Sequence, residues 1–243
     1  EGTNGAGLGE YVCSGFRYAA NGGWIHLGSG SPANGIRYQN DSGTDFGVNH
    51  DGLGNLRGFA WAANIGWINF ENIGAPTVDL ASGVLSGSVY SANCGWISLS
   101  NAVTQVRTDT ISGASDTDGD GIADAWEREK FSSLTIADAN SNADGDGLAD
   151  RLEYLADTNP LEATDELRLT FLRQDEVTPP RILLAWTTRP TRAYAVERRP
   201  TLGPDSAWED VGLLPWPSAG SASFDEFGDQ HFYRLRAFRP LAP

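Results

Sequence analysis

The chain has 243 residues, of which 40% are hydrophobic and 20% are charged, and its formal net charge is −15. This composition is typical of a folded globular protein, and the excess of acidic residues argues against a nucleic-acid-binding surface, which needs clustered Lys and Arg. The sequence also lacks an apolar stretch close to the roughly 20 residues that a membrane-spanning helix requires.

Glycine and charge divide the chain into three predicted parts. Twenty of the 29 glycines precede residue 113, which predicts a turn-rich antiparallel β domain over residues 1–112. Residues 113–165 carry 14 acidic and 3 basic residues, and this concentration indicates either an acidic linker or a cation site. Residues 166–243 alternate apolar and polar side chains, as a small β-sandwich does. The predicted fold class is therefore mainly β.

The N-terminal part contains one motif three times, at residues 15–27, 58–70 and 87–99. Its frame is Gly-x-x-aromatic-x-x-Asn-x-Gly-Trp-Ile-x-Leu/Phe. Asn and Gly tolerate positive φ, so each copy is expected to form a β-hairpin that turns at Asn-x-Gly. The Trp is constant in the frame, and Trp67 and Trp96 in the second and third copies are predicted to be structural.

The first copy differs from the others at one position. Strand alternation puts Trp24 and His26 on one face, whereas the other copies carry Asn69 and Ser98 at the place of His26. The hairpin therefore does not need His26 for folding. His50 lies downstream, in the insertion that separates the first two copies. Two histidines at this spacing are, on spacing alone, more often ordinary polar residues than a metal site.

Trp24-Ile25-His26, within a domain rich in Gly, Asn and Trp, resembles the copper-binding surface proteins of methane-oxidising bacteria. In that family a Trp two residues before a His is oxidised to kynurenine, and the kynurenine and two histidines hold Cu(I). The resemblance covers residues 1 to about 112. It implies that Trp24 is the modified residue and that His26 and His50 are the imidazole ligands, a donor type that copper accepts.

Cys13 and Cys94 are the two cysteines of the chain, and they can form a metal pair, a disulfide or two buried thiols. The disulfide is favoured in an exported chain, and the loop of about 80 residues that it closes would contribute about 4–5 kcal/mol in the chain-entropy model. The chain begins at Glu1 and contains no Met, which favours a processed protein that is secreted, or located at the surface or in the periplasm of a bacterium.

The acidic part contains the pattern D-x-D-x-D-G-x5-E, which recurs 26 residues later with Asn in the first place. Oxygen ligands at this spacing, with Gly for the sharp turn and a carbonyl after it, are what Ca²⁺ prefers. The predicted calcium ligands are Asp116, Asp118, Asp120, Ile122, Asp124 and Glu127 in the first loop, and Asn142, Asp144, Asp146, Leu148, Asp150 and Glu153 in the second.

This segment resembles the thrombospondin type 3 and dockerin-like repeats of bacterial surface proteins rather than a paired EF-hand, because no helix is expected before the first loop. Short helices are predicted after the loops, near residues 123–131 and 149–156. The resemblance implies a structural role in which calcium neutralises the charge and stiffens the connection.

The C-terminal part closes with Phe-Tyr-Arg-Leu-Arg, which resembles the end of fibronectin-like modules of exported bacterial proteins. Its predicted strands cover residues 167–172, 182–186, 194–197, 221–224 and 232–236.

These features together predict a secreted protein that captures Cu(I) for acquisition or storage, with calcium as its second cofactor. No Gly-x-Ser-x-Gly, P-loop or H-E-x-x-H motif is present, and we do not expect an enzyme. The expected partners are a copper ion and an outer-membrane or periplasmic copper-handling protein. The alternative prediction is a calcium-stabilised adhesion or structural module of the cell surface without copper.

Overall fold

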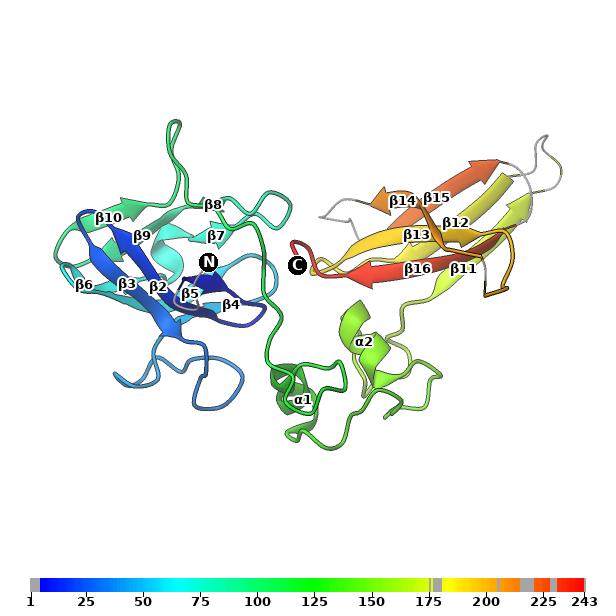
Figure 1. The fold of residues 1–243 in the computed structure, drawn as a ribbon, viewed down its shortest axis with the longest axis horizontal. Helices are drawn as coiled ribbons and strands as arrows, with labels where there is room; N and C mark the ends of the chain where they lie inside the picture. The colour runs from blue at the N-terminus through cyan, green and yellow to red at the C-terminus, as the bar shows by residue number, and fades with distance from the viewer. Residues whose placement is uncertain are drawn as a thin grey trace. The chain divides into compact units, whose positions relative to one another are not determined.

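The computed structural model describes residues 5–174, 176, 181–204, 206–214, 221–227 and 231–242. Its strands pair antiparallel, and two short α-helices follow the N-terminal strands and precede the C-terminal strands along the chain, so the predicted mainly-β class is confirmed (Figure 1). The contacts divide the chain into two compact units, residues 1–138 with 241–243 and residues 139–240. The division into three parts predicted above remains a prediction.

Each copy of the repeat folds as the predicted hairpin. The three hairpins are β2 (Cys13–Ala19) with β3 (Gly23–Ser29), β5 (Leu56–Ala62) with β6 (Gly66–Asn69), and β9 (Ser88–Ser91) with β10 (Gly95–Ser98). The second strand of each hairpin begins at a glycine with a positive φ, which is 71° at Gly23, 70° at Gly66 and 80° at Gly95. Other residues rarely adopt this conformation, which explains why the motif carries Gly there.

The hairpins form a single sheet, which has eight strands within the described residues and the order β1-β2-β3-β5-β6-β9-β10, with β4 paired to β5. The smaller elements of this region are β1 (Gly7–Leu8), β4 (Val48–His50), the 3-10 helix η1 (Asn72–Gly74), and the pair β7 (Thr77–Val78) and β8 (Leu85–Ser86). Alternate side chains point to opposite faces: in β5, Leu56 and Ala60 are buried and Trp61 is exposed. We call these the inner and the outer face.

Trp67 and Trp96, which were predicted to be structural, do not lie in the core. Trp67 pairs with the exposed Trp61 across β5 and β6, and Trp96 pairs with the exposed Tyr90 across β9 and β10. Both indoles therefore lie on the outer face and add little to the core, which is built from the alternate positions of the same strands.

The predicted disulfide between Cys13 and Cys94 is not formed, because both cysteines are free thiols. Cys13 is buried at the start of β2, whereas Cys94 is exposed in the turn between β9 and β10. Three strands separate β2 from β9 in the sheet order, at about 4.8 Å per strand, and the two residues lie at opposite ends of their hairpins. A disulfide needs Cα atoms within about 7 Å.

The C-terminal strands form two three-stranded sheets, β11-β12-β15 and β14-β13-β16, among the residues described. Their bounds are Leu169–Gln174 for β11, Arg181–Thr187 for β12, Ala193–Arg199 for β13, Glu209–Leu214 for β14, Ser221–Phe227 for β15 and Phe232–Phe238 for β16. Side chains of β12 and β13 share one core that includes Leu184, Tyr194 and Val196, as a β-sandwich requires. The five predicted strands are present, and β14 was missed.

The two helices are α1 (Asp124–Phe131) and α2 (Asp150–Ala156), each within one residue of its predicted start. Neither is long enough or apolar enough to span a membrane, and no other helix in the described part of the chain is.

Candidate metal centres

The first acidic loop brings three carboxylates together at its N-terminal end. Asp116, Asp118 and Asp120 each offer an oxygen atom, and these atoms lie within 4.8 Å of one another. The chain bends sharply here because Gly119 and Gly121 both have a left-handed backbone, with φ of 76° and 91°. Such a bend turns successive acidic side chains toward a common point.

Glu127 is the twelfth residue of this loop pattern; it is not a member of the three-carboxylate group, but the charges of that group act on it. It lies in the first turn of α1 with no exposed surface, and neither carboxylate oxygen has a hydrogen-bond partner among the described residues. Burial raises the pKa of Glu127 to about 7, and the charges of Asp118 and Asp120 add to the effect. A buried carboxylate that faces other carboxylates is costly unless a cation pairs with it.

The second loop also forms a group of three carboxylates, and here the glutamate is one of them. Oxygen atoms of Asp144, Asp146 and Glu153 lie within 4.8 Å of one another, and one oxygen of each has no hydrogen-bond partner. Glu153 is fully buried in α2, and burial raises its pKa to about 7, with a further contribution from the carboxylates of Asp144 and Asp146. Gly145 and Gly147 have φ of 77° and 101°, as their counterparts do in the first loop.

Asn142 takes the role that Asp116 has in the first loop. Asp116 accepts a hydrogen bond from the backbone N–H of Gly119 at 2.8 Å, and Asn142 accepts one from Gly145 at 2.7 Å. The substitution of Asn for Asp therefore preserves the turn and removes one negative charge.

Asp124 and Asp150, the ninth residues of the loops, use their carboxylates to close the loops. Asp124 accepts hydrogen bonds from the backbone N–H and the hydroxyl of Thr117, at 2.8 and 2.6 Å. Asp150 accepts them from the backbone N–H of Ala143 and the hydroxyl of Ser141, at 3.0 and 2.6 Å. Both were predicted as ligands, but the structure places neither in the two three-carboxylate clusters.

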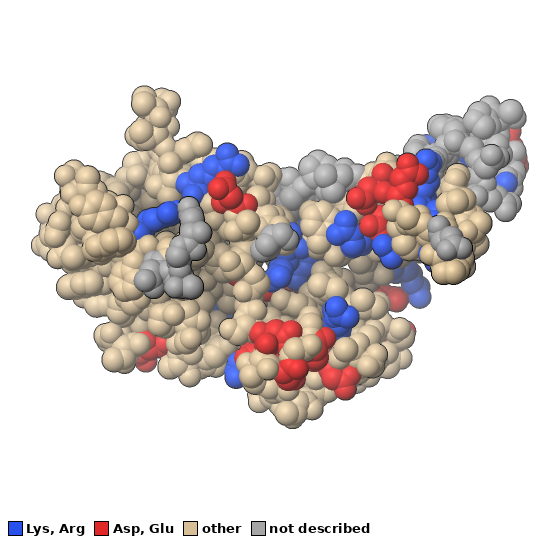
Figure 2. Space-filling model, in the orientation of Figure 1, with Lys and Arg blue, Asp and Glu red and all other residues tan. Residues whose placement is uncertain are grey.

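Ile122 and Leu148 follow the second glycine of each loop. The side chain of Ile122 is fully buried and that of Leu148 is half-buried, so each anchors its loop by apolar contact. Their carbonyl oxygens remain predicted ligands. The two sites together present hard oxygen donors, several of them buried without a partner, and this donor set fits Ca²⁺. Figure 2 shows acidic side chains concentrated over the part of the chain that includes α1.

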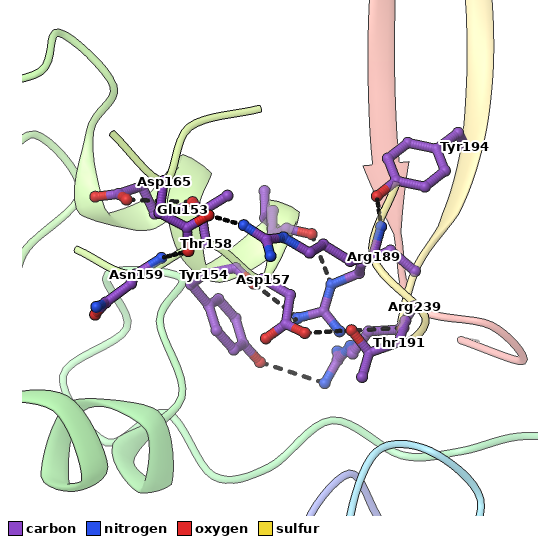
Figure 3. A network of polar contacts seen from close by, with 12 residues as sticks. Glu153, Tyr154, Asp157, Thr158, Asn159, Asp165, Arg189, Thr191, Tyr194 and Arg239 are labelled. Carbon is purple, nitrogen blue, oxygen red and sulfur yellow. Dashed lines mark hydrogen bonds and ion pairs between the residues drawn. The ribbon is translucent and has the colours of Figure 1, made fainter. Parts of the chain in front are cut away.

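The second loop is tied to the C-terminal sheets through the end of α2 (Figure 3). The hydroxyl of Thr158 donates to Glu153 at 3.2 Å. Just beyond the helix, Asp157 accepts a hydrogen bond from the hydroxyl of Thr191, and Asp165 pairs with Arg189. A ligand of the predicted second ion therefore belongs to the same polar network as the start of β13.

Arg192, the residue before β13, caps the C-terminal end of α2. Its guanidinium is buried and donates hydrogen bonds to the carbonyl oxygens of Tyr154 and Leu155, both at 2.8 Å. Carbonyl groups in the last turn of a helix lack partners within the helix and attract positive charge. Arg192 and Thr158 could not be predicted from the sequence, because neither belongs to the loop pattern and no periodic signal marks them.

The residues predicted to hold copper are divided between the two faces of the N-terminal sheet. Trp24 is exposed, and His26 pairs with the exposed Trp61, so both lie on the outer face. His50 pairs with Leu56, whose side chain is buried on the inner face, and directly paired residues point to the same side. The structure therefore does not bring His26 and His50 together.

The two histidines also differ in their surroundings. The ring of His26 stacks on Phe16 at 4.4 Å between centroids. His50 is buried, its Nδ1 lies 3.2 Å from the carbonyl oxygen of Gly9, and burial lowers its pKa. Among the residues described, no group of three ligating His, Cys, Asp or Glu side chains contains either histidine.

Comparison with known protein families supports the assignment of the acidic loops as calcium-binding repeats. Residues 116–130 and 144–163 match the family model of the bacterial TSP3 repeat, which confirms the thrombospondin type 3 part of the predicted resemblance. No curated protein and no solved structure matches the chain significantly. The resemblance to copper-binding surface proteins is therefore unsupported by any relative.

Proposed function

We propose that this chain is a calcium-stabilised structural module of an exported bacterial surface protein, and that it binds two Ca²⁺ ions. The observation that carries the proposal is the pair of buried glutamates, Glu127 and Glu153, beside the acidic residues of their loops. Both carboxylate oxygens of Glu127 and one of Glu153 have no hydrogen-bond partner among the described residues. The match to the bacterial TSP3 repeat supports both the metal and an extracellular location.

Calcium would supply the positive charge that these carboxylates lack. In the first loop Asp116, Asp118, Asp120 and Glu127 would hold the ion, and in the second Asn142, Asp144, Asp146 and Glu153 would do so. Each glutamate lies in the first turn of the helix that follows its loop, so binding would fix the start of α1 and of α2. The role is structural, and no catalytic step is part of the proposal.

Thermal unfolding with and without calcium tests this role. Each bound ion adds about 2.7 kcal/mol at a concentration of 100 Kd, so removing both by chelation should lower the melting temperature by about 10–20 °C. Glu127→Gln and Glu153→Gln should each remove about half of this shift. Glu129→Gln is the matched control, because Glu129 lies on α1 with a 43% exposed side chain and should leave the shift unchanged. A melting temperature that does not respond to chelation would refute the proposal.

Copper is a second and separate hypothesis. One observation favours it: Trp24 and His26 share the outer face, so an oxidised Trp24 and one imidazole could approach the same ion. His50 does not join them in this structure. Metal analysis and intact mass of protein purified from its native host would test the hypothesis, since kynurenine formation and copper retention should both depend on His26.

A further inference from the structure

The exposed tryptophans of the repeat are left unexplained by calcium binding. The side chains of Trp24, Trp67 and Trp96 occupy the same position in three hairpins, and each residue is 44–58% exposed. The core does not require them. Large apolar side chains that gather on one exposed face mark a binding surface.

The strand register places an aromatic partner opposite each of these tryptophans. Tyr18 pairs with Trp24, Trp61 with Trp67, and Tyr90 with Trp96, with ring centroids 5.5, 5.0 and 5.3 Å apart. We call these six residues the aromatic face. They occupy six successive strands of the sheet, and every one is at least 42% exposed. At about 4.8 Å between strands, the face extends for about 24 Å.

Two hollows with polar side chains adjoin the rings. The larger has a volume of about 420 Å³ and is lined by Phe46, Phe59 and Trp67 together with Asn40, Asp41 and Ser42. The smaller has a volume of about 160 Å³, and Tyr90 and Trp96 line it beside Asn69 and Glu71. Each hollow therefore combines an aromatic ring with an amide and a carboxylate.

The charge of this surface restricts its ligand. The six residues of the aromatic face are uncharged, and neither hollow is lined by Lys or Arg in the part of the chain described. Within the two hollows a phosphate, a sulfate or an acidic polymer would meet the carboxylates of Asp41 and Glu71 and no Lys or Arg side chain, since Arg57, on the same face of β5, does not line them. Asn40, Asn69 and Glu71 each already form a hydrogen bond with the backbone. A purely apolar partner would still cover their remaining polar atoms and the carboxylate of Asp41, which costs binding energy.

A sugar ring satisfies both requirements. One face of a pyranose presents C–H groups, which stack on an aromatic ring, and its rim presents hydroxyl groups, which bond to amides and carboxylates. Because the rings follow one another across six strands, the ligand must be an extended chain, and β-1,4-linked glycans are extended where α-linked glucans coil.

We propose that the aromatic face binds a neutral β-1,4-linked polysaccharide that runs across the strands. Trp24, Trp67 and Trp96 stack on sugar rings, and the polar side chains of the two hollows bond to hydroxyl groups. Polysaccharide binding is separate from calcium binding, because the residues that support it lie outside the acidic loops.

Binding of cellohexaose and chitohexaose, measured by calorimetry and by quenching of tryptophan fluorescence, tests the proposal. The protein should bind at least one of them in calcium-containing buffer, with little change at 1 M NaCl because the ligand carries no charge. The double variant Trp67→Ala/Trp96→Ala should lose at least tenfold in affinity, since a stacked ring contributes about 1 kcal/mol or more.

Two controls separate loss of binding from loss of fold. The double variant should keep the circular dichroism spectrum and the calcium stoichiometry of the parent. Phe171→Ala removes an aromatic side chain that is 55% exposed on β11, which belongs to the other compact unit and is not part of the aromatic face, and this variant should bind as the parent does.

Three results would overturn the proposal. The first is no binding of either hexasaccharide at millimolar concentration, and the second is full affinity in the double variant. The third is a dimer of the parent protein that the double variant abolishes, which would assign the aromatic face to a second copy of the chain. None of these results bears on calcium binding, which the thermal experiment tests independently.

Discussion

Cys13 and Cys94 differ in the surroundings that control thiol reactivity. Burial raises the pKa of the Cys13 thiol to about 12, so it carries almost no thiolate at neutral pH. Cys94 is exposed in a hairpin turn. We expect iodoacetamide at pH 8 to label Cys94 in the native protein and both cysteines after denaturation, as read by peptide mass spectrometry. Finding no free thiol in denatured, unreduced protein would restore the disulfide that the structure excludes.

Glu197 shows how a buried acid can stabilise one sheet of the C-terminal sandwich. It is 7% exposed on β13 and accepts hydrogen bonds from Arg234 and Arg236 on the neighbouring β16. Burial alone would raise the pKa of Glu197, but the hydrogen bonds and charges of the two arginines outweigh it and hold the pKa below its ordinary value. The stability from this pairing is present above the unfolded pKa of about 4.3 and is lost as pH falls through the lower folded pKa.

Glu197→Gln should therefore destabilise the protein by about 1–2 kcal/mol at pH 7 and by less at pH 3, because the contribution of the charge declines once pH falls below the unfolded pKa of about 4.3. Urea unfolding of parent and variant at both pH values measures this difference. Glu209→Gln, which removes an acid whose side chain is 67% exposed in its pair with Arg198, is the control. Equal destabilisation by Glu197→Gln at the two pH values would rule out the charge as its cause.

At the scale of elements, α2 depends on a residue far from it in sequence. Arg192→Leu would leave the carbonyl groups of Tyr154 and Leu155 without their donor, at a cost of about 1–3 kcal/mol. Because α2 carries Glu153, we expect the calcium affinity of the second loop to fall several-fold while the first loop is unchanged. A calcium titration measures both sites. Arg168→Leu, which changes an arginine with a 76% exposed side chain, should affect neither. Equal loss at both sites would contradict the capping role.

The elements that sequence predicted well are those with local signals. The hairpins follow from an Asn-x-Gly turn that recurs three times, and the helices follow from the loop spacing that ends at Glu127 and Glu153. β14 was missed because Glu209–Leu214 contains a glycine and no clear alternation. The clustering of loop carboxylates was likewise predictable from spacing, whereas the closing of the loop by Asp124 and Thr117 became visible only in three dimensions.

At the scale of the whole molecule, the predictions that failed depended on strand order. The repeat alone could not show that three strands separate β2 from β9. It also could not show that His26 and His50 pair with β5 residues whose side chains point to opposite faces of the sheet. These relations are set by long-range pairing, for which the sequence carries no local signal. The same pairing aligns the repeated Trp side chains into one surface, so a feature that suggested a structural core became a candidate binding face.

The negative charge of the acidic segment is expected to make the stability of both compact units depend on calcium. Residues 113–165 hold most of the net charge of −15, and the two loops belong to different compact units, residues 1–138 and residues 139–240. Two bound Ca²⁺ ions would offset part of this charge, one in each unit. Calcium is therefore expected to stabilise both units, through Glu127 in the first and Glu153 in the second.

Isothermal titration of the metal-free protein with calcium tests this account most directly. We predict two bound ions per chain for the parent protein and for Glu129→Gln. For Glu127→Gln and for Glu153→Gln we predict one ion at the parent's affinity, with the altered site weakened at least tenfold. A parent protein that binds no calcium at millimolar concentration, or two glutamine variants that still bind two ions as the parent does, would contradict the central claim.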